Sequence, residues 1–340
     1  MKNRLLMGIV FLLLFFSSVC GLHEVHAEEN MSPNFTVNAN LPENQLENIT
    51  GYFHVALTPG QDQHLTVDIT NTTNEVITVI PSLATATTNS NGVISYKETG
   101  DANDESLLID FKVISRLSDT EIVLDSFETK TVTIFVEIPE PAIEGQLLGG
   151  VSFEEKHSEQ NEESSAMVVN RFSYNVAVMI EIGDEMPENE LQLNEVFADQ
   201  RSGFNYIEAK LQNTAERMIS SLAVEATISR FGEETPMYIS NRTGLKMAPN
   251  SNFNYGIDLQ QTPIQPGEYT IHLMIEADDK IYEFEKAFMV TSEEANHLNE
   301  SAVLVETPNN SNLIIVISLA SGVLVLIICL TVGKKMKARK

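Results

Sequence analysis

Alternation of apolar and polar residues at every second position is the feature that most constrains how this chain can fold. It recurs along the sequence, for example in His64-Leu-Thr-Val-Asp-Ile-Thr and in Tyr269-Thr-Ile-His-Leu-Met-Ile. A period of two residues places side chains on alternate faces of a strand, whereas an amphipathic helix needs a period of about 3.6. Turn signals such as Pro59-Gly60 and Pro266-Gly267 separate these stretches. The pattern predicts an all-β protein.

The stretch between residues 28 and 312 is long enough for two domains and carries a similar strand plan twice. We therefore expect two tandem immunoglobulin-like β-sandwich domains, the first at 34–183 and the second at 184–292. The acidic loop 157–165 is either the tip of a hairpin in the first domain or a linker between domains, and the need of strand 170–182 for a partner favours the hairpin. A polar stalk at 293–312 is expected to be disordered.

The first 27 residues have the layout of a secretory signal peptide. Lys2 and Arg4 precede an apolar run, and the residues before Ala27 suit cleavage after that position. A lipoprotein site at Cys20 is the alternative, but Val19 stands where a small residue is wanted. The chain is thus expected to be exported.

Residues 313–332 form an uncharged apolar run that is long enough to cross a bilayer of about 30 Å. The basic tail at 333–340 follows at once, and an excess of Lys and Arg marks the cytoplasmic side. We expect a single-pass protein of the cell membrane with one transmembrane helix, whose ectodomain lies outside in the cell wall.

Charge and cysteine usage narrow the possible partners. The chain has 21 Lys and Arg against 48 Asp and Glu, a net charge of −27, and residues 28–312 hold 14 of the basic and 47 of the acidic residues. Such acidity excludes nucleic acid as a partner by bulk attraction and fits a neutral polymer or a basic protein, although solubility alone also explains it. Cys20 and Cys329 are the only cysteines, so no disulfide is expected between residues 28 and 312.

No sequence signature of an enzyme is present. The chain lacks a nucleophile elbow, a phosphate loop, a zinc motif and a Cys-x-x-Cys motif, so we expect no catalysis, no cofactor and no metal. Two weaker alternatives stay open. His54 and His64 could meet across a hairpin, and the oxygen-rich segment Gly100-Asp-Ala-Asn-Asp-Glu-Ser106 could hold calcium.

The polar run Ala86-Thr-Thr-Asn-Ser-Asn-Gly-Val-Ile-Ser-Tyr96 stands out within a chain of packed strands. One interpretation is a two-residue hairpin turn at Asn91-Gly92, with Tyr96 in the core. The other is a surface that touches a ligand, because amide and hydroxyl groups can hydrogen-bond sugars and peptides. Gly149-Gly150 is expected to mark a bulge or a strand break rather than a site.

Several short phrases stand out together in the sequence. Those of the expected first domain are Asn44-Gln45, Gly51-Tyr52-Phe53, Pro59-Gly60-Gln61, Ala86–Tyr96 and Gly145–Phe153. Those of the expected second domain are Asn170–Tyr174, Pro249–Phe253 and Pro266–Tyr269. In this order and spacing, the phrases resemble the WxL-interacting proteins of Gram-positive bacteria. Since Asn170–Tyr174 precedes the break expected at 183–184, the family boundary falls nearer 155–166.

The resemblance implies a surface scaffold whose first domain binds peptidoglycan and whose second binds host extracellular proteins. It also implies a partnership with secreted WxL-domain proteins. Candidate ligand contacts combine hydroxyl, amide and aromatic side chains: Tyr52, Phe53, Thr87, Thr88, Asn89, Asn91 and Tyr96. Tyr52 and Phe53 alternate in a strand, so one of the two is expected to point inward.

Two rival functions belong to the same compartment. An assembly chaperone would lend a strand to secreted surface proteins and then release them. A wall-modifying enzyme would turn over peptidoglycan, which we do not expect from this sequence.

Overall fold

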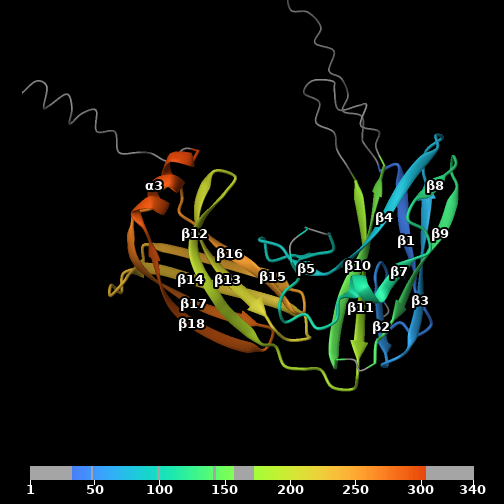
Figure 1. Cartoon of the computed structure of the whole chain (residues 1–340), viewed down its shortest axis with the longest axis horizontal. Helices are drawn as coiled ribbons and strands as arrows, with labels where there is room; N and C mark the ends of the chain where they lie inside the picture. Colours follow the sequence, from blue (N-terminus) through green and yellow to red (C-terminus); the bar gives the residue numbers. More distant parts are fainter. Residues whose placement is uncertain are drawn as a thin grey trace, which may run out of the picture.

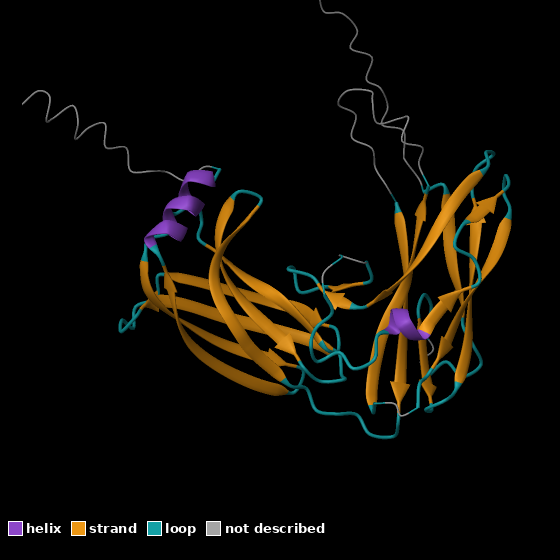
Figure 2. Ribbon diagram, viewed as in Figure 1, coloured by secondary structure: helices purple, strands orange, loops and turns teal. Residues whose placement is uncertain are grey.

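The computed structural model describes residues 33–46, 49–97, 100, 102–140, 143–156 and 172–303. The predicted signal peptide at 1–27, loop tip at 157–165, membrane helix at 313–332 and tail at 333–340 lie outside these residues. No helix within the described ranges is long and apolar enough to span a membrane. The all-β prediction is confirmed: two β-rich lobes lie side by side, with the short strand β5, Thr87–Thr88, between them (Figures 1 and 2).

The first lobe is a sandwich of two sheets, with strand orders β1-β3-β9-β7 and β2-β11-β10-β4-β8. All neighbouring strands are antiparallel except β11 and β2, which run parallel. The strands are β1 Phe35–Asn40, β2 Phe53–Leu57, β3 Asp62–Asn71, β4 Ile77–Thr85, β7 Ser115–Leu117, β8 Ile122–Leu124, β9 Thr129–Glu137, β10 Gly145–Glu155 and β11 Ser173–Ile182. The one-turn helix α2, Phe111–Ile114, follows the N-cap Asp110.

The core of the first sandwich follows the period-two pattern. Leu65, Val67 and Ile69 of β3 are buried, as are the matching apolar residues of β9 in the same sheet. Burial of such side chains stabilises the fold by about 1.5–3 kcal/mol each. β11 contributes Val178 and Ile180 to this core and pairs with β10, so it belongs structurally to the first sandwich.

β10 passes through Gly149 and Gly150 without a bulge, so the expected strand break is wrong. Its registers with β4 and β11 are continuous across both glycines. A Cβ on Gly149 would lie 2.1 Å from the ring of Phe111, and one on Gly150 would lie 2.9 Å from that of Tyr96. Glycine is needed here because two aromatic rings pack directly against the strand backbone.

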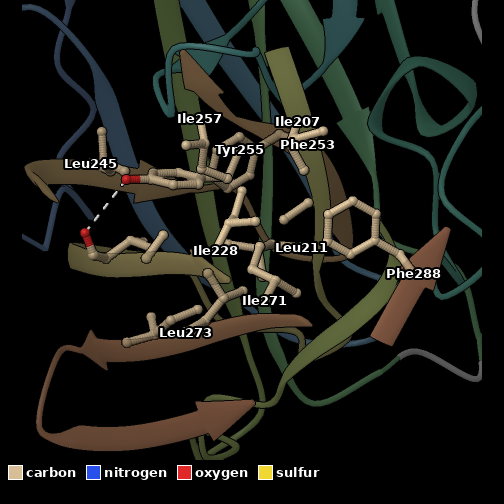
Figure 3. Packing of buried hydrophobic residues seen from close by; sticks show 14 of the residues in the cluster. Ile207, Leu211, Ile228, Leu245, Phe253, Tyr255, Ile257, Ile271, Leu273 and Phe288 are labelled. Atoms are coloured by element: carbon tan, nitrogen blue, oxygen red, sulfur yellow. Dashed lines mark hydrogen bonds between the residues drawn. The ribbon is translucent and has the colours of Figure 1, made fainter. Parts of the chain in front are cut away.

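The second lobe packs a sheet of order β12-β13-β16 against one of order β15-β14-β17-β18. Its strands are β12 Leu191–Arg201, β13 Phe204–Asn213, β14 Ile219–Arg230, β15 Tyr238–Met247, β16 Ser251–Asp258, β17 Gly267–Ala277 and β18 Lys280–Val290. Apolar side chains from both sheets meet between them (Figure 3). The hydroxyls of the buried Tyr255 and of Ser240 lie 2.9 Å apart, so this phenol is not left without a partner in the core.

The prediction of a disordered stalk is wrong for the first residues of that segment, which form helix α3, Ser292–Ser301. Thr291 and Glu294 make a reciprocal capping box that starts the helix. Ala295 is buried, and the Asn299 amide donates to the Ile264 carbonyl and accepts from the Ile264 N–H at 2.8 and 2.9 Å. The polar composition suggested disorder, whereas these specific bonds attach the helix to the second sandwich.

We predict that Gly149→Ala lowers the free energy of unfolding by about 1–3 kcal/mol, because the added methyl group collides with Phe111. The same change in a Phe111→Ala background should cost much less, since the ring is gone. Denaturant unfolding of the four proteins of this double-mutant cycle measures both values. Equal losses in the two backgrounds would contradict the steric explanation.

Candidate functional site

The polar run forms a hairpin that leaves the first sandwich and reaches the second. β5, Thr87–Thr88, pairs with β6, Ile94–Ser95, and the intervening loop is Asn89–Val93. The predicted two-residue turn is therefore wrong. The Asn89 side-chain oxygen accepts the N–H groups of Asn91 and Val93 at 2.9 and 3.2 Å, which fixes the wider loop.

Thr88 makes a buried hydrogen-bond chain with the second sandwich. Its Oγ1 accepts the Ala248 N–H at 3.0 Å and lies 2.7 Å from the Ser251 hydroxyl. The Ser251 hydroxyl donates to the Ala248 carbonyl at 2.8 Å, so the Thr88 hydroxyl is left to donate to Ser251. Thr88 is only 7% exposed, which means that its side chain is an interdomain contact rather than a surface ready for a ligand.

The loop of the hairpin presents three consecutive carbonyl groups to donors of the second sandwich. Arg201 donates to the Ser90 carbonyl at 3.1 Å, and Arg242 to the Asn91 carbonyl at 2.9 Å. The Lys246 N–H donates to the Gly92 carbonyl at 2.8 Å. Arg201 is itself held by the buried carboxylate of Glu208, with a guanidinium-to-carboxylate distance of 2.5 Å.

The segment after the hairpin makes a second set of interdomain bonds. The Asp104 carboxylate accepts the side-chain amides of Gln212, at 2.7 Å, and of Asn252. The Asn250 amide donates to the Ser106 carbonyl at 3.1 Å. We call the hairpin 87–95, the segment 102–110 and their partners in the second sandwich the seam.

A cleft of about 740 Å³ opens at the seam. Its walls are the hairpin with the strand end before it, Gly100, residues of the segment 102–112, and residues 250–254 of the second sandwich. Thr87, Thr88 and Asn89 of the predicted contact residues line it. The structure therefore joins part of the predicted surface to the phrase Pro249–Phe253 of the other domain, which the sequence marked for its resemblance but not as a ligand contact.

The other predicted contacts do not line the cleft. Phe53 is fully buried in the first core, so its assignment as a ligand contact is wrong, and its neighbour Tyr52 is half-buried. Asn91 is exposed at the loop, where its carbonyl is bonded to Arg242. Tyr96 packs over Gly150, and its burial, followed by the nearby Tyr52, raises its pKa to about 12.

The two histidines do not form a metal site together. His54 lies on β2 and His64 on β3, which belong to different sheets. His54 contacts Glu181 at 2.9 Å, while the His64 ring packs edge-on against Phe135. Within the described ranges, no cluster of three or more His, Cys, Asp or Glu residues is placed to hold a metal ion.

We predict that Thr88→Val weakens the seam by about 1–3 kcal/mol, because the buried Ala248 N–H loses its acceptor. Thr88→Ser keeps the hydroxyl and should cost less. Denaturant unfolding gives the stability, and hydrogen exchange of the Ala248 amide reports the bond directly. Unchanged protection of that amide in Thr88→Val would contradict the assignment.

The pH dependence of the seam follows from Asp104. Burial raises its pKa, but hydrogen bonds from Asn252, Ser106 and Gln212 outweigh burial and hold the pKa below its ordinary value. A lowered carboxyl pKa stabilises the fold fully above the unfolded value of about 3.9, and this stability is lost as pH falls through the lowered pKa. The stability gap between wild type and Asp104→Asn should thus be full at about pH 6 and shrink below about pH 4. A gap that is constant across this range would show that the ionised carboxylate is not what the amides hold.

Models of two protein-domain families match the two parts of this chain. The model of the WxL-interacting protein peptidoglycan binding domain matches residues 35–155, and that of the host binding domain matches residues 163–300. The second match begins before β11, which pairs within the first sandwich. A search of curated proteins finds no match.

Solved structures share only a distant likeness. A chain of the chaperone–tip adhesin complex of CFA/I fimbriae is 9% identical, with a TM-score of 0.32, and the match covers 76% of this chain and 98% of that one. The E. coli chaperone DraB is 12% identical, with a TM-score of 0.28 and coverage of 74% and 98%. Likenesses of this size carry no conclusion about function.

The two family matches lie in the expected order and together span most of the chain. They confirm the resemblance drawn from Gly51-Tyr52-Phe53, the polar run and the later phrases. The chain belongs to the WxL-interacting proteins, with a peptidoglycan binding domain followed by a host binding domain.

Proposed function

We propose that this protein is a non-enzymatic scaffold of the cell surface, held to the membrane by one helix at 313–332. Its first domain binds peptidoglycan, and its second holds WxL-domain proteins and host extracellular proteins. The observation that carries this proposal is the seam, because it ties a peptidoglycan binding domain to a host binding domain through several direct hydrogen bonds. A scaffold that connects a wall to a partner needs such a joint.

The chemistry of the seam supports binding of a neutral polymer. The cleft is lined mainly by hydroxyl and amide side chains, which hydrogen-bond neutral groups well. The chain as a whole is strongly acidic, so association with an anionic polymer is opposed by its net charge of −27. Export through the signal peptide at 1–27 would deliver this surface to the wall.

The immunoglobulin-like classification belongs to the same proposal. In the second sandwich, the first, second and fifth strands form one sheet, and the other four form the second sheet. Immunoglobulin-type sandwiches likewise divide seven strands between two sheets of three and four. Such sandwiches recur in cell-surface proteins that bind rather than catalyse, which agrees with a scaffold.

We predict that the full chain in detergent sediments with purified peptidoglycan from which teichoic acids have been removed. The control is an unrelated acidic membrane protein of similar charge, which should stay in the supernatant. Failure of this chain to pellet would contradict wall binding. Release of sugar or peptide fragments from the polymer would contradict the non-enzymatic role.

WxL binding is tested separately. Immobilised full chain should retain a purified WxL-domain protein in a complex that survives washing. If the WxL-domain protein is instead released as soon as it has folded, the assembly-chaperone alternative is favoured over the scaffold.

A further inference from the structure

The cleft at the seam has the size and the free polar groups of a binding site. Its volume of about 740 Å³ lies within the range of about 300–1,000 Å³ that is usual for small-ligand sites. Among the described residues, no hydrogen-bond partner exists for the Thr87 hydroxyl, the Asn89 side-chain NH₂, the Asn103 side-chain oxygen or the Asn254 amide. All four residues line the cleft. Asn254 comes from the second sandwich and the others from the first, so one ligand could use both domains.

Lys97 brings an exposed positive charge to the cleft. Asp104 is occupied by Asn252 and Gln212, and Asp110 accepts from Thr85, from Asn103 and from the Lys112 N–H. Lys97 lines the same cleft. The ammonium of Lys97 is largely exposed and lies 3.9 Å from Glu154, a distance at which an exposed pair is weak. A ligand carboxylate can therefore pair with the Lys97 ammonium, although the chain as a whole is acidic.

The cleft lacks the aromatic surface on which sugars stack. Phe253 is the one aromatic residue among its lining, and it is only 3% exposed because its side chain belongs to the second core. Hydroxyl and amide groups can hydrogen-bond the main chain and side chains of a peptide without such a surface. The chemistry thus favours a peptide over the flat face of a glycan.

We propose that the seam cleft binds the peptide portion of the wall polymer, a short peptide with a free carboxylate, through residues of both domains. This inference rests on the proposed wall-binding function and assigns it to a place. Because Asn254 and Asn89 come from different domains, the bound peptide stabilises the docked arrangement by RT ln(1 + [L]/Kd). The wall ligand and the orientation of the host binding domain are then linked.

The test uses the full chain in detergent and two probes, a synthetic wall stem peptide with a free C-terminal carboxylate and a peptide-free N-acetylglucosamine tetramer. Titration calorimetry should detect the peptide and not the tetramer. Asn254→Ala should weaken peptide binding by about tenfold or more, equal to about 1.4 kcal/mol. Asn241→Ala, which removes an exposed amide on β15 outside the cleft, should leave it unchanged. Lys97→Glu, a change at an exposed side chain, should weaken binding independently, and the effect should fall with added salt.

The outcomes separate the two proposals. If whole peptidoglycan sediments the chain but the peptide does not bind, wall binding stands and the cleft assignment is overturned. If the peptide binds equally to wild type, Asn254→Ala and Lys97→Glu, the site lies elsewhere and the assignment is again overturned. If the tetramer binds and Asn254→Ala abolishes that binding, the cleft is a glycan site and the peptide class is wrong. If neither the polymer nor the peptide binds, both proposals fall.

Discussion

The relative position of the two sandwiches depends on the hydrogen bonds that the Thr88 hydroxyl makes with the second sandwich. This hydroxyl accepts the Ala248 N–H and donates to Ser251, and Thr88 is only 7% exposed. A buried donor without an acceptor costs about 1–3 kcal/mol. Separation of the hairpin from the second sandwich therefore costs stability unless water replaces Thr88 as the acceptor of the Ala248 N–H. The three carbonyls of the hairpin loop and the Asp104 carboxylate add charge-assisted and amide bonds around this point.

The seam accounts for a polar run within a β-sandwich protein. Residues 86–96 lie between the two sandwich cores and belong to neither, although Ala86 is buried in a small apolar cluster against which Ile94 and Tyr96 pack. Thr88 and Asn89 use their side chains to fix the hairpin and its contact, while Ser90, Asn91 and Gly92 contribute carbonyls. The hairpin contributes to the position of the host binding domain together with the segment 102–110 and with Gln146, which bonds Glu216 and Met218. In the proposed scaffold, this contact holds the host binding domain and its bound partner at a fixed position relative to the wall-bound domain.

The sequence predicted the sheets well and the contacts between domains poorly, for physical reasons. Period-two alternation identifies β3 and β17 because each buries one face, and the same rule anticipated that one of Tyr52 and Phe53 would be buried. The rule says nothing about distant residues that meet, so the pairing of Arg201 with Glu208 and its contact with Ser90 could not be inferred. Local composition misled twice. Gly149-Gly150 accommodates two aromatic rings in a regular strand, and the polar residues of α3 are ordered by the Thr291 cap and by Asn299.

The proposed scaffold requires a fixed relation between the two sandwiches, and a distance distribution measures that relation directly. Spin labels at Glu137 and Glu225 sit on exposed strand positions of the first and second sandwich, and serine at Cys20 and Cys329 removes the native thiols. Double electron–electron resonance on the full chain in detergent should give one narrow distribution of interspin distances. It should broaden when Thr88→Val is introduced. A broad distribution in the wild type, unchanged by that substitution, would show that the sandwiches move independently and would contradict the seam as the organising contact.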